Sequence, residues 1–571
     1  MAVAGISEGA DSEMLHQIGL AGGVHTQNTA RSLISMCFRN YGIDLKPAYI
    51  KVPRYVKRSG KVIDSVATVL EPHRIFGLLH DHPKANSLWG RPRQWSRFWH
   101  LMREEVWLKQ HPLFNDIKMN PDKFCPVLLH QDDAPVSRRV GRNFKALNMI
   151  GPLGDKQGVG TMSVSPLAVM QNDDCLAKIV RRKQEETVVL SSKQSAENKY
   201  SFSFPSFMCP DPVRESNKGK KIVATDERLA FAGFTGDWMM LALDFEMPAH
   251  YNRWEICMTC RAEKGGLLNY ADFRKNAPWA STSRDVTEWL DHLDSINSEL
   301  PELGHVLGFH ATNFFEDQLH ADALGLRQHA CGSCLRDLCD AGHFGPTPAG
   351  PGKWQEKLDA QLQRATLEFH RWLADSRLSS TQAAFRTLGL TLKRQDDSAC
   401  LKAKGKNCIT VSQWLLSKTR EILAANPTDW HDKMRVALFL GLDGIWDVPH
   451  RIRPRFELTA AEADELESHR LCALSAMYSL HRDAQMRGAP AYNLTPKYHQ
   501  TDELCRRSSR TRVAAHLFWC FRAEDHMGKL AQIMYRTHGA TSKRRVLELW
   551  LIDFWLRLEG SDGGDVASSS V

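Results

Sequence analysis

The chain has 571 residues, which is long enough for several domains and at least one large hydrophobic core. Hydrophobic residues make up 43% of the sequence and charged residues 25%, as is typical of a globular protein. We find no run of about 18 apolar residues and no secretory signal, so we expect no membrane partner and no secretion. The 74 basic and 66 acidic residues permit a polyanionic partner without requiring one.

The pattern along the first 340 residues predicts helices followed by strands. Residues 1–12 are expected to be disordered, and residues 13–115 form a mainly helical N-terminal region. Short apolar segments between Gly and Pro turns then predict strands, so we place the first part of an α/β core at 120–340. A polar linker interrupts this core at about 183–222.

The second half of the chain is predicted to be mainly helical. A Gly/Pro linker at 341–352 separates it from the core. Apolar residues at three- and four-residue spacing predict a helical insertion at 353–490. Residues 491–558 complete the core with closing helices, and 559–571 form a disordered tail. The order predicts an α/β core interrupted by a large helical insertion.

Two acidic segments follow apolar runs and are candidates for metal-dependent phosphoryl transfer. In "LLHQDDAPVSRR" the run ends in Asp132 and Asp133, and in "GFTGDWMM" Gly236 permits a tight turn before Asp237. Such chemistry needs hard oxygen ligands for Mg²⁺ or Mn²⁺ that converge from separate strands. The alternative is that these acids form ordinary turns or caps.

Two further segments place acids beside helices. In "FFEDQLHADALG" Asp317 stands three residues before His320. This pair is either a helix cap with a surface histidine or a piece of a metal-dependent nucleic-acid enzyme. In "FRAEDHMGKL" Glu524 and Asp525 precede a helix, where the helix dipole alone favours acidic residues.

The 14 cysteines predict reduced thiols, some of them available to a metal. Cys257 and Cys260 have the spacing of a zinc-binding pair. Their partners are left open between Cys331 with Cys334 and one of three histidines, His305, His310 or His320. Cys331, Cys334 and Leu335 would also form one buried face of a predicted helix, which needs no metal.

The order of these segments resembles the catalytic core of cut-and-paste DNA transposases, closest in style to the CACTA group and its transposon-derived relatives. The resembling segments span about residues 120 to 540. They are "LLHQDDAPVSRR", "GDWMMLALDFEMPAHYNRWEICMTCRAE", "NAPW" (276–279), "DQLHADALGLRQHACGSCL", "PKYH" (496–499) and "FRAEDHMGKL".

The resemblance implies an RNase H-like mixed sheet with a triad of two aspartates and a glutamate. Asp132 matches the first acid, with Asp133 as its alternative, and Asp237 matches the second. Glu524 matches the third, with Glu503 as its alternative. Asp317 and His320 match an Asp-x2-His motif, and the helical block between His320 and Glu524 matches an insertion domain.

The implied activity is cleavage and strand transfer of DNA with two Mg²⁺ or Mn²⁺ ions held by Asp132, Asp237 and Glu524. Arg138 and Arg139 would contact backbone phosphates. Such a protein would act in the nucleus, or otherwise remain in the cytoplasm, and its assembly as a homo-oligomer is left open.

Two other functions are kept beside this one. The chain could be a domesticated, non-catalytic DNA-binding or scaffold protein of the same fold. It could also be a mainly helical interaction protein with a small zinc site and no RNase H-like sheet.

Overall fold

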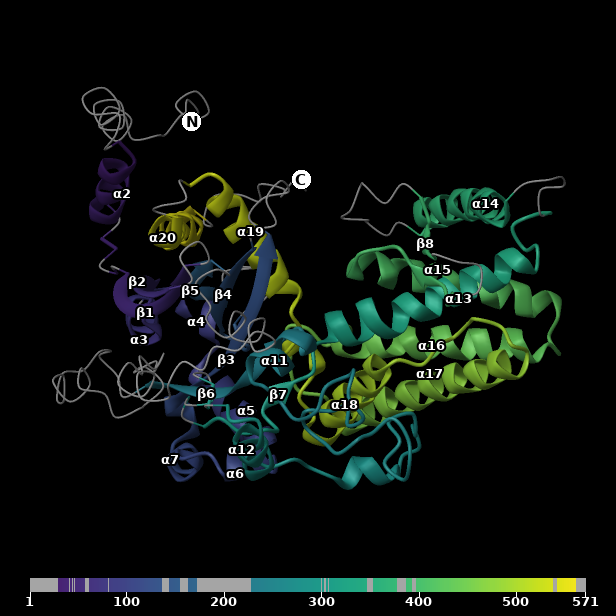
Figure 1. Cartoon of the computed structure of the whole chain (residues 1–571), viewed down its shortest axis with the longest axis horizontal. Helices are drawn as coiled ribbons and strands as arrows, with labels where there is room; N and C mark the ends of the chain where they lie inside the picture. The colour runs from purple at the N-terminus through teal and green to yellow at the C-terminus, as the bar shows by residue number, and fades with distance from the viewer. Residues whose placement is uncertain are drawn as a thin grey trace.

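In the computed structural model, a seven-stranded sheet with its covering helices lies beside a lobe built almost entirely of helices (Figure 1). The structure describes residues 29–171 and 227–560, apart from 41, 44, 46, 57–60, 81, 136–142, 155–162, 299, 302–303, 305, 307, 347–352, 377–386, 393–396 and 538–541. Residues 1–12, which were predicted to be disordered, and the predicted linker at 183–222 lie outside the described residues. The same holds for 561–571 of the predicted tail and for Arg138, Arg139 and His305.

The sheet is mixed, with the strand order β1-β2-β5-β4-β3-β6-β7. Strands β3, β4 and β5 pair antiparallel, whereas β3, β6 and β7 run parallel. The strand bounds are β1 Ala48–Val56, β2 Lys61–Val69, β3 Phe124–Pro135, β4 Asn143–Ile150, β5 Val164–Gln171, β6 Arg228–Gly236 and β7 Phe314–Phe315. The predicted combination of a mixed sheet with many helices is therefore confirmed at the level of an α/β architecture.

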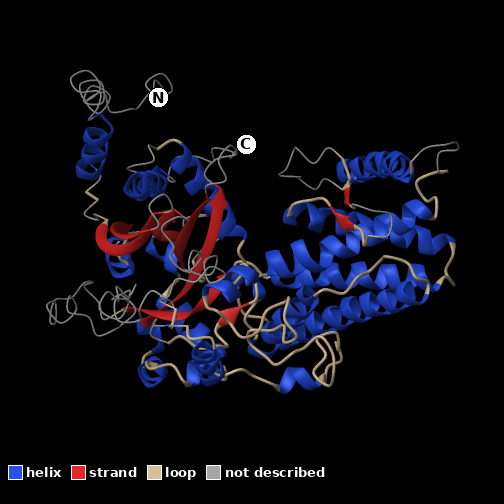
Figure 2. Ribbon diagram, in the orientation of Figure 1, coloured by secondary structure: helices blue, strands red, loops and turns tan. Residues whose placement is uncertain are grey.

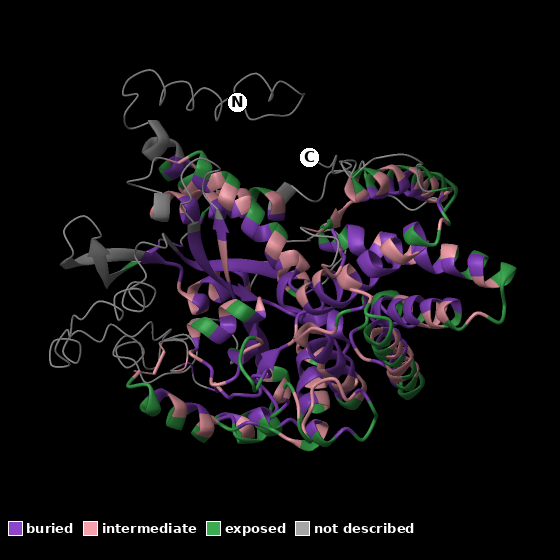
Figure 3. Cartoon of the chain, turned by 45° about the vertical axis from the view of Figure 1, so that its right-hand side comes forward, coloured by how far each residue is buried: buried purple, intermediate pink, exposed green. Residues whose placement is uncertain are grey.

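The central strands are buried on both faces because helices cover the sheet from either side. In β3, Val127, Leu128 and Leu129 have no exposed surface, and eight of the nine residues of β6 are buried. Such continuous apolar runs are typical of parallel strands between helical layers. The burial of the central strands is visible in Figure 3.

The N-terminal region differs from the prediction of a mainly helical segment. Helices α3 (Pro72–His80) and α5 (Pro92–Met102) are present, but residues 48–69 form the hairpin β1–β2 and extend the sheet. Most of β1 lies in the segment "DLKPAYIKVPRY". The β-branched and aromatic residues of this segment favour a strand, and Lys61–Val69 pair with it.

The helices on the sheet side of the molecule come from before and after the helical lobe in the chain. Besides α3 and α5 they include α2 Thr29–Asn40, α4 Ala85–Trp89, α6 Val106–Lys109, α7 Phe114–Met119, α11 Trp238–Asp244, α12 Val286–Ser295, α19 Phe521–Tyr535 and α20 Ser542–Gly560. Helix α19 contacts β3 and β5, and α20 contacts β2 and β5. The chain therefore returns to the sheet after the helical lobe, as the predicted closing helices require.

The helical lobe contains α13 Arg327–Asp340, α14 Trp354–Asp375, α15 Gly405–Ala425, α16 Trp430–Arg451, α17 Ala460–Met486 and α18 Pro496–Thr511 (Figure 2). Helices α16 and α17 pack closely because glycines of α16 face α17. A Cβ atom at Gly441 would lie 2.5 Å from the backbone nitrogen of Ala473. The lobe has its own hydrophobic core, distinct from that of the sheet. The predicted helical insertion is thus part of a larger lobe that also includes α13 and α18.

Within the described part of the chain, no helix is both long enough and apolar enough to cross a membrane. The cysteines of these residues are all free thiols.

Candidate metal-binding sites

Asp132 and Asp237 stand at the same edge of the sheet. Strands β3 and β6 run parallel, with Gln131 paired to Gly236, so Asp132 and Asp237 are the next residues along neighbouring strands. Neighbouring strands lie about 4.8 Å apart. Asp237 also caps helix α11 by accepting a hydrogen bond from the backbone N–H of Met239 at 3.2 Å. The turn-and-cap alternative for Asp237 is therefore correct as local structure, and the cap leaves the residue beside Asp132.

Helix α19 brings Glu524 to Asp132. The potential ligand atoms of His130, Asp132 and Glu524 all lie within 4.8 Å of one another. His130 and Asp132 are two residues apart on β3 and so point to the same face, whereas Asp133 points to the other. We call these three residues with Asp237 the acid cluster. Neither Asp133, the alternative to Asp132, nor Asp237 is part of the ligand group, but the charge of Asp237 acts on Glu524 and His320.

The pKa values of Asp132 and Glu524 are raised although the cation His320 lies nearby. Burial and the nearby Glu524 carboxylate raise the pKa of Asp132 to about 8. Burial also raises the pKa of Glu524, with Asp317 and Asp237 acting in the same direction. His130 is buried, its pKa is lowered by burial to about 4, and its Nε2 atom has no hydrogen-bond partner. A divalent cation would supply the missing charge and ligand contacts.

His320 stands between the acid cluster and Asp317. Its Nδ1 atom lies 2.6 Å from Oδ2 of Asp317 and its Nε2 atom 3.8 Å from Oε1 of Glu524. Burial opposes protonation, but the hydrogen bond to Asp317 and the nearby carboxylates outweigh it and raise the pKa of His320 to about 9. His320 is therefore a cation among carboxylates at neutral pH.

Asp317 has the capping role offered for its motif, although His320 is not a surface histidine. Its carboxylate accepts hydrogen bonds from the backbone N–H groups of Leu319 and His320, as a cap of the π-helical turn η7 (Leu319–Leu326). It also accepts one from the backbone N–H of Cys520, just before α19. The same buried side chain thus orients His320 and fixes the start of the helix that carries Glu524.

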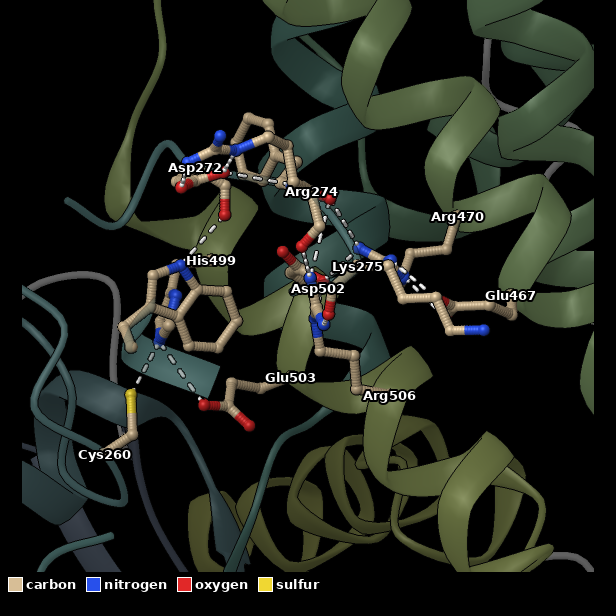
Figure 4. A network of polar contacts seen from close by, with 12 residues as sticks. Cys260, Asp272, Arg274, Lys275, Glu467, Arg470, His499, Asp502, Glu503 and Arg506 are labelled. Atoms are coloured by element: carbon tan, nitrogen blue, oxygen red, sulfur yellow. Dashed lines mark hydrogen bonds and ion pairs between the residues drawn. The ribbon is translucent and has the colours of Figure 1, made fainter. Parts of the chain in front are cut away.

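A second group forms around Cys257 and Cys260. Together with His499 and Glu503 of α18, their potential ligand atoms all lie within 4.8 Å of one another. The Sγ atom of Cys260 is 3.3 Å from Nε2 of His499, which is 3.7 Å from Oε1 of Glu503 (Figure 4). We call these four residues the cysteine–histidine cluster. Two sulfurs, one imidazole and one carboxylate are a ligand set that zinc binds in tetrahedral geometry.

The cysteine–histidine cluster is also prepared for a cation. Burial opposes ionisation of the Cys257 thiol, but hydrogen bonding by Cys260 and the neighbouring His499 outweigh it and hold its pKa well below the usual value. Zinc binds the thiolate form of cysteine. All three residues with nitrogen or sulfur ligands are buried, so the group is closed to solvent on most sides.

An ion-pair network holds α18 in place beside the cysteine loop. Asp502, adjacent to Glu503, is buried and binds Arg470 of α17 and Arg506 of α18 (Figure 4). Both arginines donate to backbone carbonyls in the loop 273–275. His499 is packed at its edge by Trp279, with ring centroids 4.3 Å apart. These contacts keep His499 and Glu503 facing Cys257 and Cys260.

The partners proposed for the cysteine pair from sequence are not the ones the structure provides. Cys331 and Cys334 are buried with Leu335 in α13, within the core of the helical lobe, so that buried-face interpretation is correct. His310 bonds Thr312, and His320 belongs with Asp317. Glu503, offered as an alternative third acid, lies in the cysteine–histidine cluster, and Glu524 lies beside Asp132.

Sequence reasoning missed His130 and His499 as ligands. For His130 the signal was its position two residues before Asp132 in a predicted strand. For His499 it was the four-residue spacing to Glu503, which places both on one face of a helix. A small cavity lies beside the cysteine–histidine cluster, and its lining includes Gly236, Cys257, Glu316, Asp317 and Glu503.

No protein-family model matches the chain, and no curated protein shows significant similarity to it.

Proposed function

We propose that the chain is a metal-dependent enzyme that cleaves and joins DNA strands, of the transposase type that its sequence segments resemble. The observation that carries the proposal is the convergence of Asp132, Asp237 and Glu524. Asp132 of β3 and Glu524 of α19 lie in one ligand group, and Asp237 follows β6 at the same sheet edge, where its charge acts on His320 and Glu524. Convergent carboxylates from separate elements are what a two-metal phosphoryl-transfer site requires.

The strand arrangement supports the same proposal at the level of the fold. An antiparallel set of strands continues into parallel strands, with acids on the central strand and its parallel neighbour. This arrangement is compatible with the RNase H-like core that the resemblance implies. It contradicts the alternative of a helical protein without a sheet.

The residues of the site have different proposed roles in metal binding and in stabilising charge. Asp132, Asp237 and Glu524 would hold Mg²⁺ or Mn²⁺, with His130 as a nitrogen ligand that favours Mn²⁺. The bound ions would activate the attacking oxygen and stabilise the leaving oxygen of an in-line displacement at phosphorus. Protonated His320 donates through Nδ1 to Asp317 and keeps its Nε2 proton beside Glu524, where it offsets the negative charge of a phosphate. Binding of cations requires Asp132 and Glu524 to lose the proton that they share.

We also propose that the cysteine–histidine cluster is a structural zinc site. It joins the loop after α11 to helix α18 of the helical lobe and so fixes the lobe against the sheet. Its four protein ligands leave no open position, as in structural rather than catalytic zinc centres.

Nicking of supercoiled plasmid by the full chain tests the catalytic proposal. We expect nicking with Mn²⁺ and, more slowly, with Mg²⁺, and its loss in Asp237→Asn. Bound but uncut DNA under both ions would favour the non-catalytic, domesticated alternative instead. The nuclear location and the homo-oligomeric state remain predictions.

A further inference from the structure

A cationic surface without acidic partners lies beside the candidate catalytic site. Arg453 follows the end of α16, and Arg522 stands in the first turn of α19, two residues before Glu524. In the described part of the chain neither guanidinium forms an ion pair with a carboxylate. Their neighbours differ, since Arg451 pairs with Asp447 and Glu465. The lack of a carboxylate partner therefore distinguishes Arg453 and Arg522 from Arg451.

Both arginines keep their charge in unfavourable surroundings. Each is half-buried, and the Nε atom of each has no hydrogen-bond partner. Burial lowers the pKa of Arg453 to about 10, with the charge of Arg522 acting in the same direction. An unpaired, partly desolvated charge destabilises a fold, so such residues are usually retained for a ligand.

Aromatic side chains hold Arg453 in a fixed position. Its guanidinium lies 4.0 Å from the ring centroid of Trp519. Trp519 stacks on Trp446 with centroids 5.5 Å apart, and Phe521 packs at the edge of both. The two tryptophans are only 8% and 7% exposed, which leaves too little surface to stack on a base. They act as a rigid wall that orients the arginine.

The cationic surface includes residues from the lobe and from the sheet side. Lys406 of α15 lies 5.6 Å from the ring of Trp446, and its pKa is lowered by burial and by Arg453. Arg522 donates to the hydroxyl of Ser163 at 2.6 Å. Leu319, next to His320, packs in the same small core as Trp446 and Trp519. The surface therefore adjoins the acid cluster but does not neutralise it.

We propose that Arg453 and Arg522, assisted by Lys406, bind consecutive phosphates of the DNA strand whose neighbouring phosphate enters the acid cluster. A phosphodiester strand is the ligand that matches both regions, because one phosphate meets metal-bound carboxylates while the next ones meet unpaired guanidiniums. Arginine is suited to this task by its planar fork of donors. The inference rests on the proposed function in taking DNA as the substrate, and it assigns the residues that hold the strand.

The test is the salt dependence of DNA binding, measured by fluorescence anisotropy with a short labelled duplex and the full chain in the absence of divalent ions. Each phosphate contact contributes about 0.9 to the slope of log Kd against log salt. We expect Arg453→Gln and Arg522→Gln each to lower the slope by about 1, and the double variant by about 2. Arg453→Lys keeps the charge and should keep the slope. Arg451→Gln is the matched control. It removes the same charge two residues before Arg453, but from an arginine that already has carboxylate partners.

A melting curve of the free protein separates ligand binding from a structural role. Loss of an unpaired charge should leave the melting temperature of Arg522→Gln unchanged or raise it, whereas loss of a structural residue lowers it. Slopes that fall only in the Arg453 and Arg522 variants support the inference, whether or not the wild type cuts DNA. Equal slopes in all variants, or no DNA binding by the wild type, overturn it. If the wild type cleaves DNA and the Arg453 and Arg522 variants have the same slope as the wild type, the proposed function stands and only this inference is overturned.

Discussion

The acid cluster and the cysteine–histidine cluster both group potential metal ligands, yet their ligand sets differ in kind. The cysteine–histidine cluster offers four ligand groups of mixed type, which can close around one ion without further ligands. The acid cluster offers carboxylates that repel one another, a histidine with an unsatisfied nitrogen, and a half-exposed edge. The difference supports the proposed division between a structural zinc site and a site that takes a substrate.

The surroundings of the two clusters follow the same division. Around His499 and Glu503, ion pairs such as Asp502 with Arg470 are complete and buried. Around Glu524, the nearby cations Arg453 and Arg522 have no carboxylate partners among the described residues. Natural proteins tolerate such unfavourable arrangements mainly where function needs them.

The largest expected effect is loss of activity on changing the acid cluster. Asp132→Asn should lower metal-dependent DNA nicking by about 10³-fold or more, since about 4 kcal/mol of transition-state stabilisation is lost with a metal ligand. Asp133→Asn is the matched control, because it makes the same change one residue along the strand and should nick DNA at nearly the wild-type rate. If Asp133→Asn loses more nicking activity than Asp132→Asn, Asp133 is the metal ligand and the geometry of the acid cluster is contradicted.

Changes in the cysteine–histidine cluster should lower the stability of the fold. Cys260→Ala should release the zinc and lower the melting temperature by roughly 10 °C, because metal binding contributes directly to folding. Cys334→Ala removes an equally buried cysteine without ligand neighbours and should lower it far less. Elemental analysis of the purified chain should give about one zinc per molecule in the wild type and in Cys334→Ala. A chain purified without zinc and with equal losses in both variants would reduce the cluster to ordinary core packing.

Changing Asp317 should have an effect of intermediate size on nicking, because this side chain orients His320 and fixes the start of α19. Asp317→Asn places an amide donor against the backbone N–H and ring N–H of His320, so the imidazolium loses its partner. We expect nicking to fall by roughly 10- to 100-fold. His320→Gln should show a similar loss, and the double variant little more, because residues that act as a unit are not additive. Independent, additive losses would mean that Asp317 serves only as a helix cap.

The sequence was sufficient to identify the acidic segments but not to assemble the clusters. Asp132, Asp237 and Glu524 were recognisable by their place after apolar runs and before a helix, together with the resemblance. The partners of Cys257 and Cys260 were not, because Cys260 and His499 are 239 residues apart and only the packing of the helical lobe brings them together. The hairpin of residues 48–69 was missed because its prolines and charges obscured an alternating strand pattern.

The smallest expected effect is the loss of folding stability on acidification that arises from His111. This loss must be known before zinc release at low pH is interpreted. His111 is buried away from both clusters, its Nδ1 atom accepts from the backbone N–H of Leu113, and burial lowers its pKa to about 4. In the unfolded chain its pKa is about 6.5, so the unfolded state binds more protons between these values and stability falls as the pH drops through this window. The cost between pH 7 and pH 5 is about 2 kcal/mol.

His111→Asn keeps an acceptor for Leu113 but cannot be protonated, so its stability should change less over this range. Chemical denaturation of the wild type and the variant at both pH values measures the difference. If His111→Asn loses as much stability as the wild type on acidification, the sensitivity arises elsewhere, and the cysteine–histidine cluster becomes the first place to seek it, because protons compete with zinc for Cys257, Cys260 and His499.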